Sequence, residues 1–273
     1  MQKLPSDSSD TANINDAIGT IHFVTGEFEQ ARERFEAAVR ICRLLTGSNE
    51  LLASKLNNLA SCLTSLELFD QASAIFEEAL GIYRGMNYHD QGNECKVAMI
   101  LSNLARAMME SGRVWEARDM LEEALDADIG ELGESHVEVS RDMKNLAQFY
   151  IATNQIVEAK KMLERVLALD ICLHGESGLE VAGDYNQLGI LWADMGHYEK
   201  ARPLLEKCVQ IHETVNGESF ELGQALNVMA FLLLNMRQEK KAAVFGRRAV
   251  QIFERYVEPH NPLVVETKKL WGA

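Results

Sequence analysis

The residues that could do covalent or metal chemistry are spread along the chain without forming a catalytic pattern. The sequence has no P-loop, no GxGxxG, no HExxH and no GxSxG motif. Cys172 and His174 are close together, but a lone C-x-H pair supplies too few ligands for a metal site. Adjacent acids such as Glu77 and Glu78 are expected on the hydrated side of a helix. We therefore expect no catalytic residue, no metal and no cofactor.

Carboxamide side chains that recur at nearly equal intervals indicate binding chemistry more clearly than the scattered His, Cys and acidic residues do. They follow one another at spacings of 45, 42 and 42 residues and are Asn58, Asn103, Asn145 and Gln187. Asparagine competes with the helix backbone for hydrogen bonds, so its recurrence indicates that something outside the helix selects it. An amide offers a donor and an acceptor and can bind the backbone of an extended peptide. The alternative is that these amides bridge neighbouring helices.

Cations lie beside the central amides in an otherwise acidic protein. Arg141 and Lys144 are one helical turn apart, Gln148 is one turn further on, and Arg106 precedes them by one repeat. Such a patch selects carboxylates, because the arginine fork matches them bidentately. The alternative is salt bridging to nearby acids such as Glu110.

The equivalent positions become apolar toward the C-terminus. Ile190, Ala193, Phe231 and Leu234 occupy them. An apolar lining beside a cationic patch suits an acidic motif with an aromatic anchor. The alternative is that these residues form a core beneath the C-terminal segment.

The elements that position these side chains repeat six times. Each segment has one anchoring alanine, at spacings of 41, 45, 42, 42 and 41, and these are Ala31, Ala72, Ala117, Ala159, Ala201 and Ala242. A small residue stands twelve positions earlier in each segment, and these are Gly19, Ala60, Ala105, Ala147, Gly189 and Ala230. Apolar residues on both sides of each turn have helical spacing, which predicts a helical hairpin in every segment.

Glycines mark the turns of three hairpins. Gly26, Gly112 and Gly196 fall between the two helices, where a positive φ favours glycine. One hairpin cannot bury its apolar face alone, so the six must stack into a solenoid.

The pattern apolar-x₂-Leu-small-x₂-apolar followed by Ala-x₃-Phe resembles the tetratricopeptide repeat. Residues 56–76 and 185–205 show it, and the resemblance covers residues 13–266. The period of about 42 exceeds the usual 34 and, with the runs at 56–60 and 201–204, is similar to kinesin light chain repeats. Most loops lack the full Leu-Gly-x-x-His-Pro signature, since only His260 lies near a proline. No segment resembles the heptad coiled coil of light chains.

This resemblance implies an all-α, right-handed superhelix whose first helices line a concave groove. In related domains, asparagine at the recurring position binds peptide main chain. The predicted peptide-binding residues are Asn58, Asn103, Arg106, Arg141, Lys144, Asn145, Gln148, Gln187, Ile190 and Phe231.

The predicted domain plan has a tail, six repeats and a cap. Residues 1–12 are rich in serine and aspartate and are predicted to be disordered. The six predicted repeats are 13–53, 54–98, 99–140, 141–182, 183–223 and 224–266. Residues 263–273 are predicted to form a short capping helix. The long polar end of repeat two, residues 85–94, is interpreted as a tolerated loop insertion.

The charge and the apolar content of the chain indicate which kinds of partner and compartment are unsuited to it. Lys and Arg number 27 against 41 Asp and Glu, a net charge of −14, which disfavours nucleic acid and anionic membrane surfaces. The longest apolar run, Val228–Leu234, is too short to span a bilayer. The N-terminus has no secretory signal pattern. Five cysteines without a CxxC indicate the cytoplasm or another reducing compartment. Import into an organelle after removal of a transit peptide is compatible with the same sequence.

We expect a non-enzymatic adaptor that binds an acidic linear motif of another protein in the groove. The first alternative is an assembly scaffold that self-associates or binds a folded partner through the convex face or the C-terminal end. The second is a regulatory domain of a larger chain.

Overall fold

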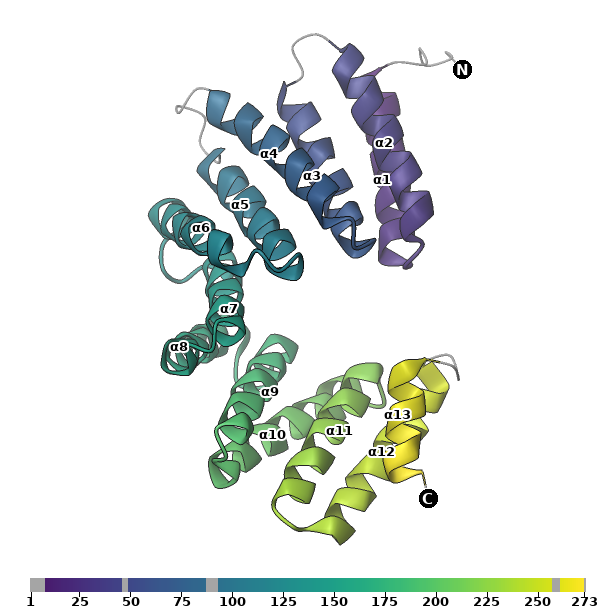
Figure 1. Ribbon diagram of the computed structural model, residues 1–273, viewed down its shortest axis with the longest axis vertical. Coiled ribbons are helices and arrows are strands. Elements are labelled where there is room, and N and C mark those ends of the chain that lie inside the picture. Colours follow the sequence, from purple (N-terminus) through teal and green to yellow (C-terminus); the bar gives the residue numbers. More distant parts are fainter. Residues whose placement is uncertain (1–7, 46–48, 87–92, 257–260, 273) are drawn as a thin grey trace. The chain divides into compact units, whose positions relative to one another are not determined.

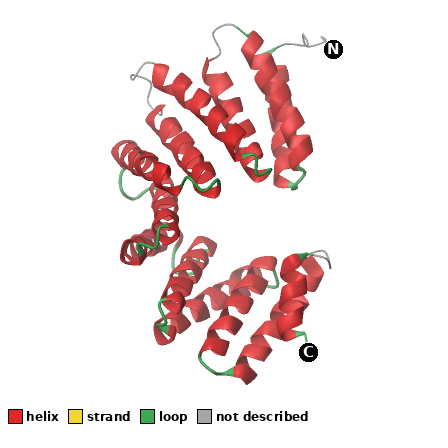
Figure 2. Ribbon diagram, viewed as in Figure 1, coloured by secondary structure: helices red, strands yellow, loops and turns green. Residues whose placement is uncertain are grey.

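The computed structural model describes residues 8–45, 49–86, 93–256 and 261–272, and within these ranges it is built of helices without a strand (Figure 2). The all-α prediction is therefore confirmed. The chain divides into two compact units, residues 1–154 and 155–273, which are described separately. The division falls inside the predicted fourth repeat.

Unit 1 contains three helical hairpins and a further first helix (Figure 1). Its helices are α1 (Ser9–Val24), α2 (Phe28–Leu44), α3 (Asn49–Ser65), α4 (Phe69–Gly85), α5 (Asn93–Glu110), α6 (Ala117–Leu132) and α7 (Val137–Ala152). A 3₁₀ turn at Val114–Glu116 precedes α6. The first helices α1, α3, α5 and α7 contact one another in chain order, and α2, α4 and α6 each pack between two of them.

Unit 2 continues the pattern and ends in a short helix. It contains α8 (Ile156–His174), α9 (Leu179–Asp194), α10 (Tyr198–Ile211), α11 (Phe220–Asn235), α12 (Glu239–Tyr256) and α13 (Pro262–Trp271), with a π turn at His212–Asn216 after α10. The α13 helix packs on α12, where the Trp271 ring lies directly against Gly246. This contact covers the end of the last hairpin.

Every hairpin turns through one residue with a positive φ. Gly26, Gly112 and Gly196 have φ of 80°, 85° and 77°, as their positions predicted. In the alternate hairpins, the same turn position holds Glu67, Asn154 and Arg237, with φ of 60°, 58° and 60°. The turn geometry is therefore constant, although only half of the turns have the residue that adopts it most easily.

Close approach of the paired helices explains the small residues before each turn. Ala60, Ala105 and Ala230 are fully buried. A Cβ on Gly19 would lie 2.8 Å from Phe35, and one on Gly189 would lie 2.7 Å from Leu205. The two glycines therefore leave space that an aromatic or leucine side chain of the second helix fills.

The N-terminal boundary differs from the prediction of a disordered tail over residues 1–12. The α1 helix begins at Ser9, because the Ser8 hydroxyl caps it by accepting a hydrogen bond from the Thr11 backbone N–H at 3.2 Å. Each first helix likewise begins about one turn before the predicted repeat boundary. Residues 1–7 of the predicted tail, 87–92 of the repeat-two insertion and His260 lie outside the described residues.

A buried acid pair joins α6 to α7. Asp128 and Asp142 are both fully buried, and the negative charge of Asp128 acts on the Asp142 carboxyl group. The Ser102 hydroxyl of α5 also donates to Asp142 Oδ1, at 2.7 Å. Burial raises the pKa of Asp142 to about 7, the Ser102 hydrogen bond opposes this rise, and the negative charge of Asp128 adds to it.

Replacing Gly189 tests the close approach of α9 and α10. Gly189→Ala should lower the free energy of unfolding by about 1–3 kcal/mol, because the new methyl group overlaps Leu205. Gly183→Ala is the matched control on the same helix, since no atom lies within 4 Å of its Cβ position. It should stabilise by about 0.5–1 kcal/mol through helix propensity. Denaturant unfolding measures both, and equal stability of the two variants would contradict the packing.

The acid pair makes stability depend on pH. An unfolded aspartate has a pKa of about 3.9, below that of folded Asp142, so between about pH 4 and 7 the folded chain binds more protons. The contribution of Asp142 to stability is full below about pH 4 and is lost as the pH rises through 7. Asp142→Asn keeps the hydrogen bonds without titrating, so it should be more stable than wild type at pH 8, by on the order of 2 kcal/mol.

Thermal melting at several pH values measures this difference. The advantage of Asp142→Asn should grow between about pH 4 and 7 and then stay constant. Asp126→Asn is the control, because Asp126 is exposed on the same helix as Asp128 and should melt in parallel with wild type. A pH-independent difference between Asp142→Asn and wild type would contradict the raised pKa of Asp142.

Candidate functional site

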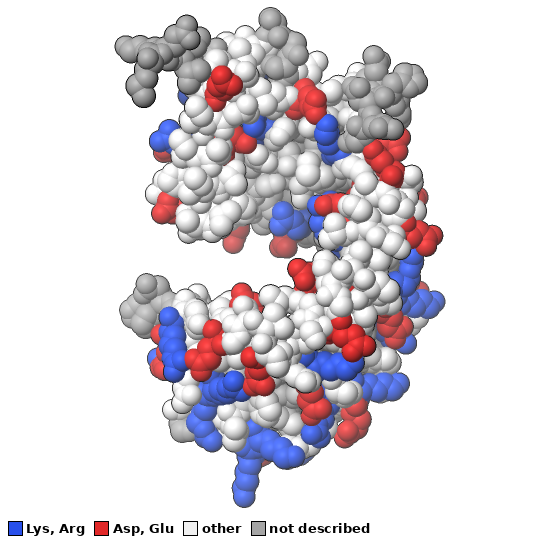
Figure 3. Space-filling model, turned by 180° about the vertical axis from the view of Figure 1, so that it is seen from behind, with Lys and Arg blue, Asp and Glu red and all other residues white. Residues whose placement is uncertain are grey.

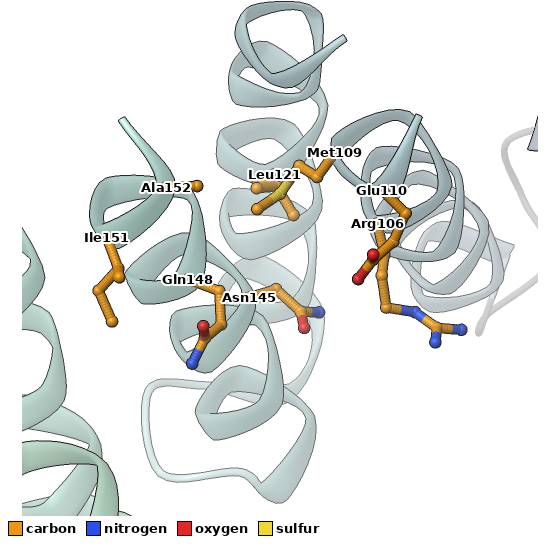
Figure 4. A pocket seen from close by; sticks show the side chains of 8 residues that line it. All are labelled: Arg106, Met109, Glu110, Leu121, Asn145, Gln148, Ile151 and Ala152. Atoms are coloured by element: carbon orange, nitrogen blue, oxygen red, sulfur yellow. The ribbon is translucent and has the colours of Figure 1, made fainter. Parts of the chain in front are cut away.

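A cavity of about 480 Å³ opens between α5 and α7 in unit 1. Its walls are formed by the two first helices, and Leu121 of α6 lies between them (Figure 4). The lining residues are Arg106, Met109, Glu110, Leu121, Asn145, Gln148, Ile151 and Ala152. Three of the residues predicted to bind peptide therefore meet in one place, namely Arg106, Asn145 and Gln148.

The polar groups of this cavity stand on opposite walls. Figure 4 shows Arg106 and Glu110 on α5, and Asn145 and Gln148 on α7. Arg106 is exposed and has no ion-pair partner among the described residues. The Asn145 amide likewise makes no hydrogen bond within the described part of the chain. A cation and an amide are therefore available to a ligand, while Met109 and Ile151 supply apolar surface above the buried Leu121.

Two other predicted amides are engaged by neighbouring first helices. The Asn58 amide donates to Asp16 Oδ1 at 2.9 Å, and Asp16 also binds the Lys55 ammonium at 2.8 Å. The Asn103 amide donates to Asn57 Oδ1 at 3.0 Å. The amide N–H groups of Asn58 and Asn103 therefore bridge neighbouring first helices, as the alternative interpretation expects. The Asn145 amide makes no such bridge among the described residues.

The predicted cations of α7 do not line the cavity. Arg141 contacts Glu138 at 2.5 Å on its own helix, and its Nε lies 3.9 Å from Asp142. Lys144 is half-buried on the same helix. The salt-bridging alternative therefore holds for Arg141, although with Glu138 rather than Glu110, and Arg106 is the cation that the cavity presents.

The remaining predicted residues belong to unit 2. Gln187 and Ile190 are half-buried on α9, and Phe231 of α11 is partly exposed. The Phe231 ring stands edge-on to the Trp271 ring of α13, with centroids 5.8 Å apart. Trp271 also donates from its indole N–H to Asn227 Oδ1 at 3.3 Å. Phe231 is therefore in contact with the C-terminal helix while part of its ring reaches solvent.

Sequence reasoning missed the apolar part of the cavity and the acid pair beside it. Met109 and Ile151 look like ordinary core residues in sequence, because helical spacing alone does not separate a core position from a lining position. The acid pair did leave a signal. Asp128 and Asp142 recur 42 residues later as Asp170 and Asp184, which are also buried.

The charges of unit 2 form no single-sign field on the face shown in Figure 3. Lysine and arginine side chains are interspersed with aspartate and glutamate there.

Within the described ranges, no group of three or more His, Cys, Asp or Glu side chains could hold a metal ion. No described helix combines the length and apolar character needed to cross a bilayer.

Comparison with known structures shows the same fold in several proteins. BtubC (BKLC) from P. vanneervenii superimposes with a TM-score of 0.73 at 22% identity, over 84% of this chain and 92% of that one. A putative kinesin light chain with TPR-like repeats from Podosopora anserina gives 0.64 at 20% identity, over 78% and 99%. The Rap protein complexed with competence and sporulation factor gives 0.68 at 12% identity, over 99% and 76%. At these identities the likeness concerns the fold.

Comparison with family models and with curated sequences completes the assignment. No curated protein sequence matches the chain. A model described as tetratricopeptide repeat matches residues 10–85 and 96–171, and a second model of the same description matches residues 185–220. Because the first model alone spans more than half of the sequence, the chain belongs to the tetratricopeptide repeat family.

Proposed function

We propose that this protein is a non-enzymatic adaptor and that the α5–α7 cavity of unit 1 binds an extended acidic segment of another protein. A tetratricopeptide repeat protein is consistent with a role in protein–protein interaction, and the fold is typically an interaction scaffold. The observation that carries the proposal is the cavity itself, which joins an unpaired arginine, an amide without an internal partner and apolar surface.

Charge and hydrogen bonding favour an extended peptide with a carboxylate near Arg106. The guanidinium can bind a carboxylate through two parallel hydrogen bonds. The Asn145 amide can bind a peptide N–H and C=O together, because it carries a donor and an acceptor. Met109 and Ile151 then contact an apolar side chain of the same segment.

Glu110 limits where the ligand carries its negative charge. It lies one turn from Arg106 on α5 and lines the same cavity. A second carboxylate beside Glu110 would meet a like charge, which disfavours binding. The preferred ligand therefore has its acid at the Arg106 end and a neutral or basic residue at the Glu110 end.

Two observations favour the alternative of an assembly scaffold. Phe231 is 40% exposed near the C-terminal helix, so a partner can contact it there. The α1 helix near the other end of the sequence also presents the exposed apolar side chains Ile14 and Ile21. The Rap protein, which shares the fold, was solved in complex with a factor, so the architecture is compatible with a bound partner.

Charge reversal at Arg106 tests the proposal. Short acidic, neutral and basic peptides are titrated against each variant by calorimetry. Acidic peptides should bind wild type best, and Arg106→Glu should weaken them at least tenfold, about 1.4 kcal/mol. Glu110→Gln is the matched control on the same helix and should strengthen binding, because it removes a repulsive charge.

Salt dependence separates the two kinds of contact. Binding of acidic peptides to wild type should weaken at high salt, and this sensitivity should shrink in Arg106→Glu. Asn145→Ala should weaken binding equally at low and high salt, since it removes hydrogen bonds and no charge. If Arg106→Glu and Asn145→Ala both bind acidic peptides like wild type, the cavity is not the site and the scaffold alternative becomes the better account.

A further inference from the structure

The α1 helix exposes an apolar face that has no counterpart in the later first helices. Ile14 is 49% exposed and Ile21 is 64% exposed. They lie seven residues apart, two helical turns, so they share one face of α1, with Ala17 exposed between them. Helix α1 packs on α2 and α3, and neither of them covers this face.

The repeat alignment shows what should cover these two positions. In the five later first helices, the residues equivalent to Ile14 are all buried and are Lys55, Ile100, Asp142, Asp184 and Ala225. The residues equivalent to Ile21 are also all buried and are Cys62, Ala107, Phe149, Leu191 and Leu232. Exposure at both positions is therefore specific to α1, which has no hairpin before it in the described chain.

The contacts of the equivalent residues define the missing element. Cys62 donates to the Phe28 carbonyl at the start of α2, and Phe149 stands edge-on to Trp115 just before α6, with centroids 6.0 Å apart. At the other end of the face, Asp142 meets Asp128 in the last turns of α6. The covering element is therefore a helix that runs antiparallel to the first helix.

Helix α1 itself has the chemistry of such a covering helix. A two-fold axis across its centre places Ile14 of one copy opposite Ile21 of the other, in antiparallel direction, with the small Ala17 near the axis. The exposed side chains from Asn13 to Val24 carry no formal charge. Two copies of a chain with a net charge of −14 can therefore meet between Ile14 and Ile21 without facing like charges there, and the exposed Asp10 lies one turn outside this stretch.

We propose that the α1 face is an isologous interface, in which α1 of a second copy of this chain packs antiparallel over Ile14 and Ile21. The contact is self-complementary, as two-fold symmetry requires. One helix pair buries less surface than a permanent dimer does, so the association is reversible and depends on concentration. The interface uses none of the residues that line the α5–α7 cavity, so each can fail without the other.

Sedimentation velocity of the full chain over a range of concentrations tests the interface. Wild type should pass from monomer to dimer, and Ile21→Glu should weaken dimerisation at least tenfold. Val24→Glu is the matched control: Val24 is 79% exposed, more than Ile21, but its equivalents, including Glu110 and Asn235, are exposed in every later repeat. Val24→Glu should dimerise like wild type. Circular dichroism melting confirms that each variant is folded.

Disulfide trapping tests the direction of the pairing. In a Cys172→Ser background, Ala17→Cys should form a covalent dimer on mild oxidation, because Ala17 lies near the two-fold axis. Val24→Cys should not, since antiparallel pairing holds the two copies of that residue about 20 Å apart at 1.5 Å rise per residue.

Three outcomes would overturn the proposal. The first is a wild-type chain that stays monomeric at the highest concentration. The second is a dimer that survives Ile21→Glu. The third is growth into longer species that Val265→Glu on α13 abolishes and Ile21→Glu does not, which would indicate an end-to-end contact through the exposed Val265.

Discussion

Within each unit, a first helix such as α3, α5 or α11 is covered on two sides, by its own second helix and by the second helix of the preceding hairpin. The contact between a first helix and its own second helix requires small residues on the first helix. Gly19 and Gly189 are such residues, and Phe35 and Leu205 of the second helices pack directly against them. The contact with the preceding hairpin requires residues that tolerate complete burial, such as Phe149 and Leu232. Because no single hairpin satisfies both contacts, stability is shared between neighbours.

This constraint explains which parts of the fold could be predicted. The anchoring alanines and the small residues before the turns recur because the two helices of every hairpin approach each other closely. The sequence pattern therefore predicted the hairpins and their order. The repeat pattern does not specify where a helix starts, since a cap such as Ser8 depends on one local hydrogen bond rather than on a repeating contact. The positive φ at Glu67 and Arg237 was also missed, because neither residue type marks a left-handed turn.

The candidate site was harder to predict, because residues at one repeat position have different neighbours. Asn103 and Asn145 are equivalent in sequence, yet Asn103 donates to Asn57 while Asn145 faces the cavity. What differs is the preceding first helix, which offers an amide acceptor to Asn103, whereas Asn145 shares its cavity with Arg106 of the preceding first helix. Arg141 was likewise predicted from its helical face, but Glu138 three residues earlier engages it. Periodicity identifies the face, and only the neighbours decide whether a polar group is available.

The same two-sided constraint assigns different roles to the two ends of a repeat array. Inside the array, the buried Asp142 accepts a hydrogen bond from Ser102 of the adjacent first helix, and burial raises its pKa, which favours the neutral carboxyl group. At the C-terminal end, α13 provides the missing cover, and Trp271 reaches both Gly246 and Phe231. At α1, the position equivalent to Asp142 is Ile14, and no described element covers it. An uncharged apolar residue there is what an intermolecular helix contact requires, since a carboxylate without its internal partners would oppose burial.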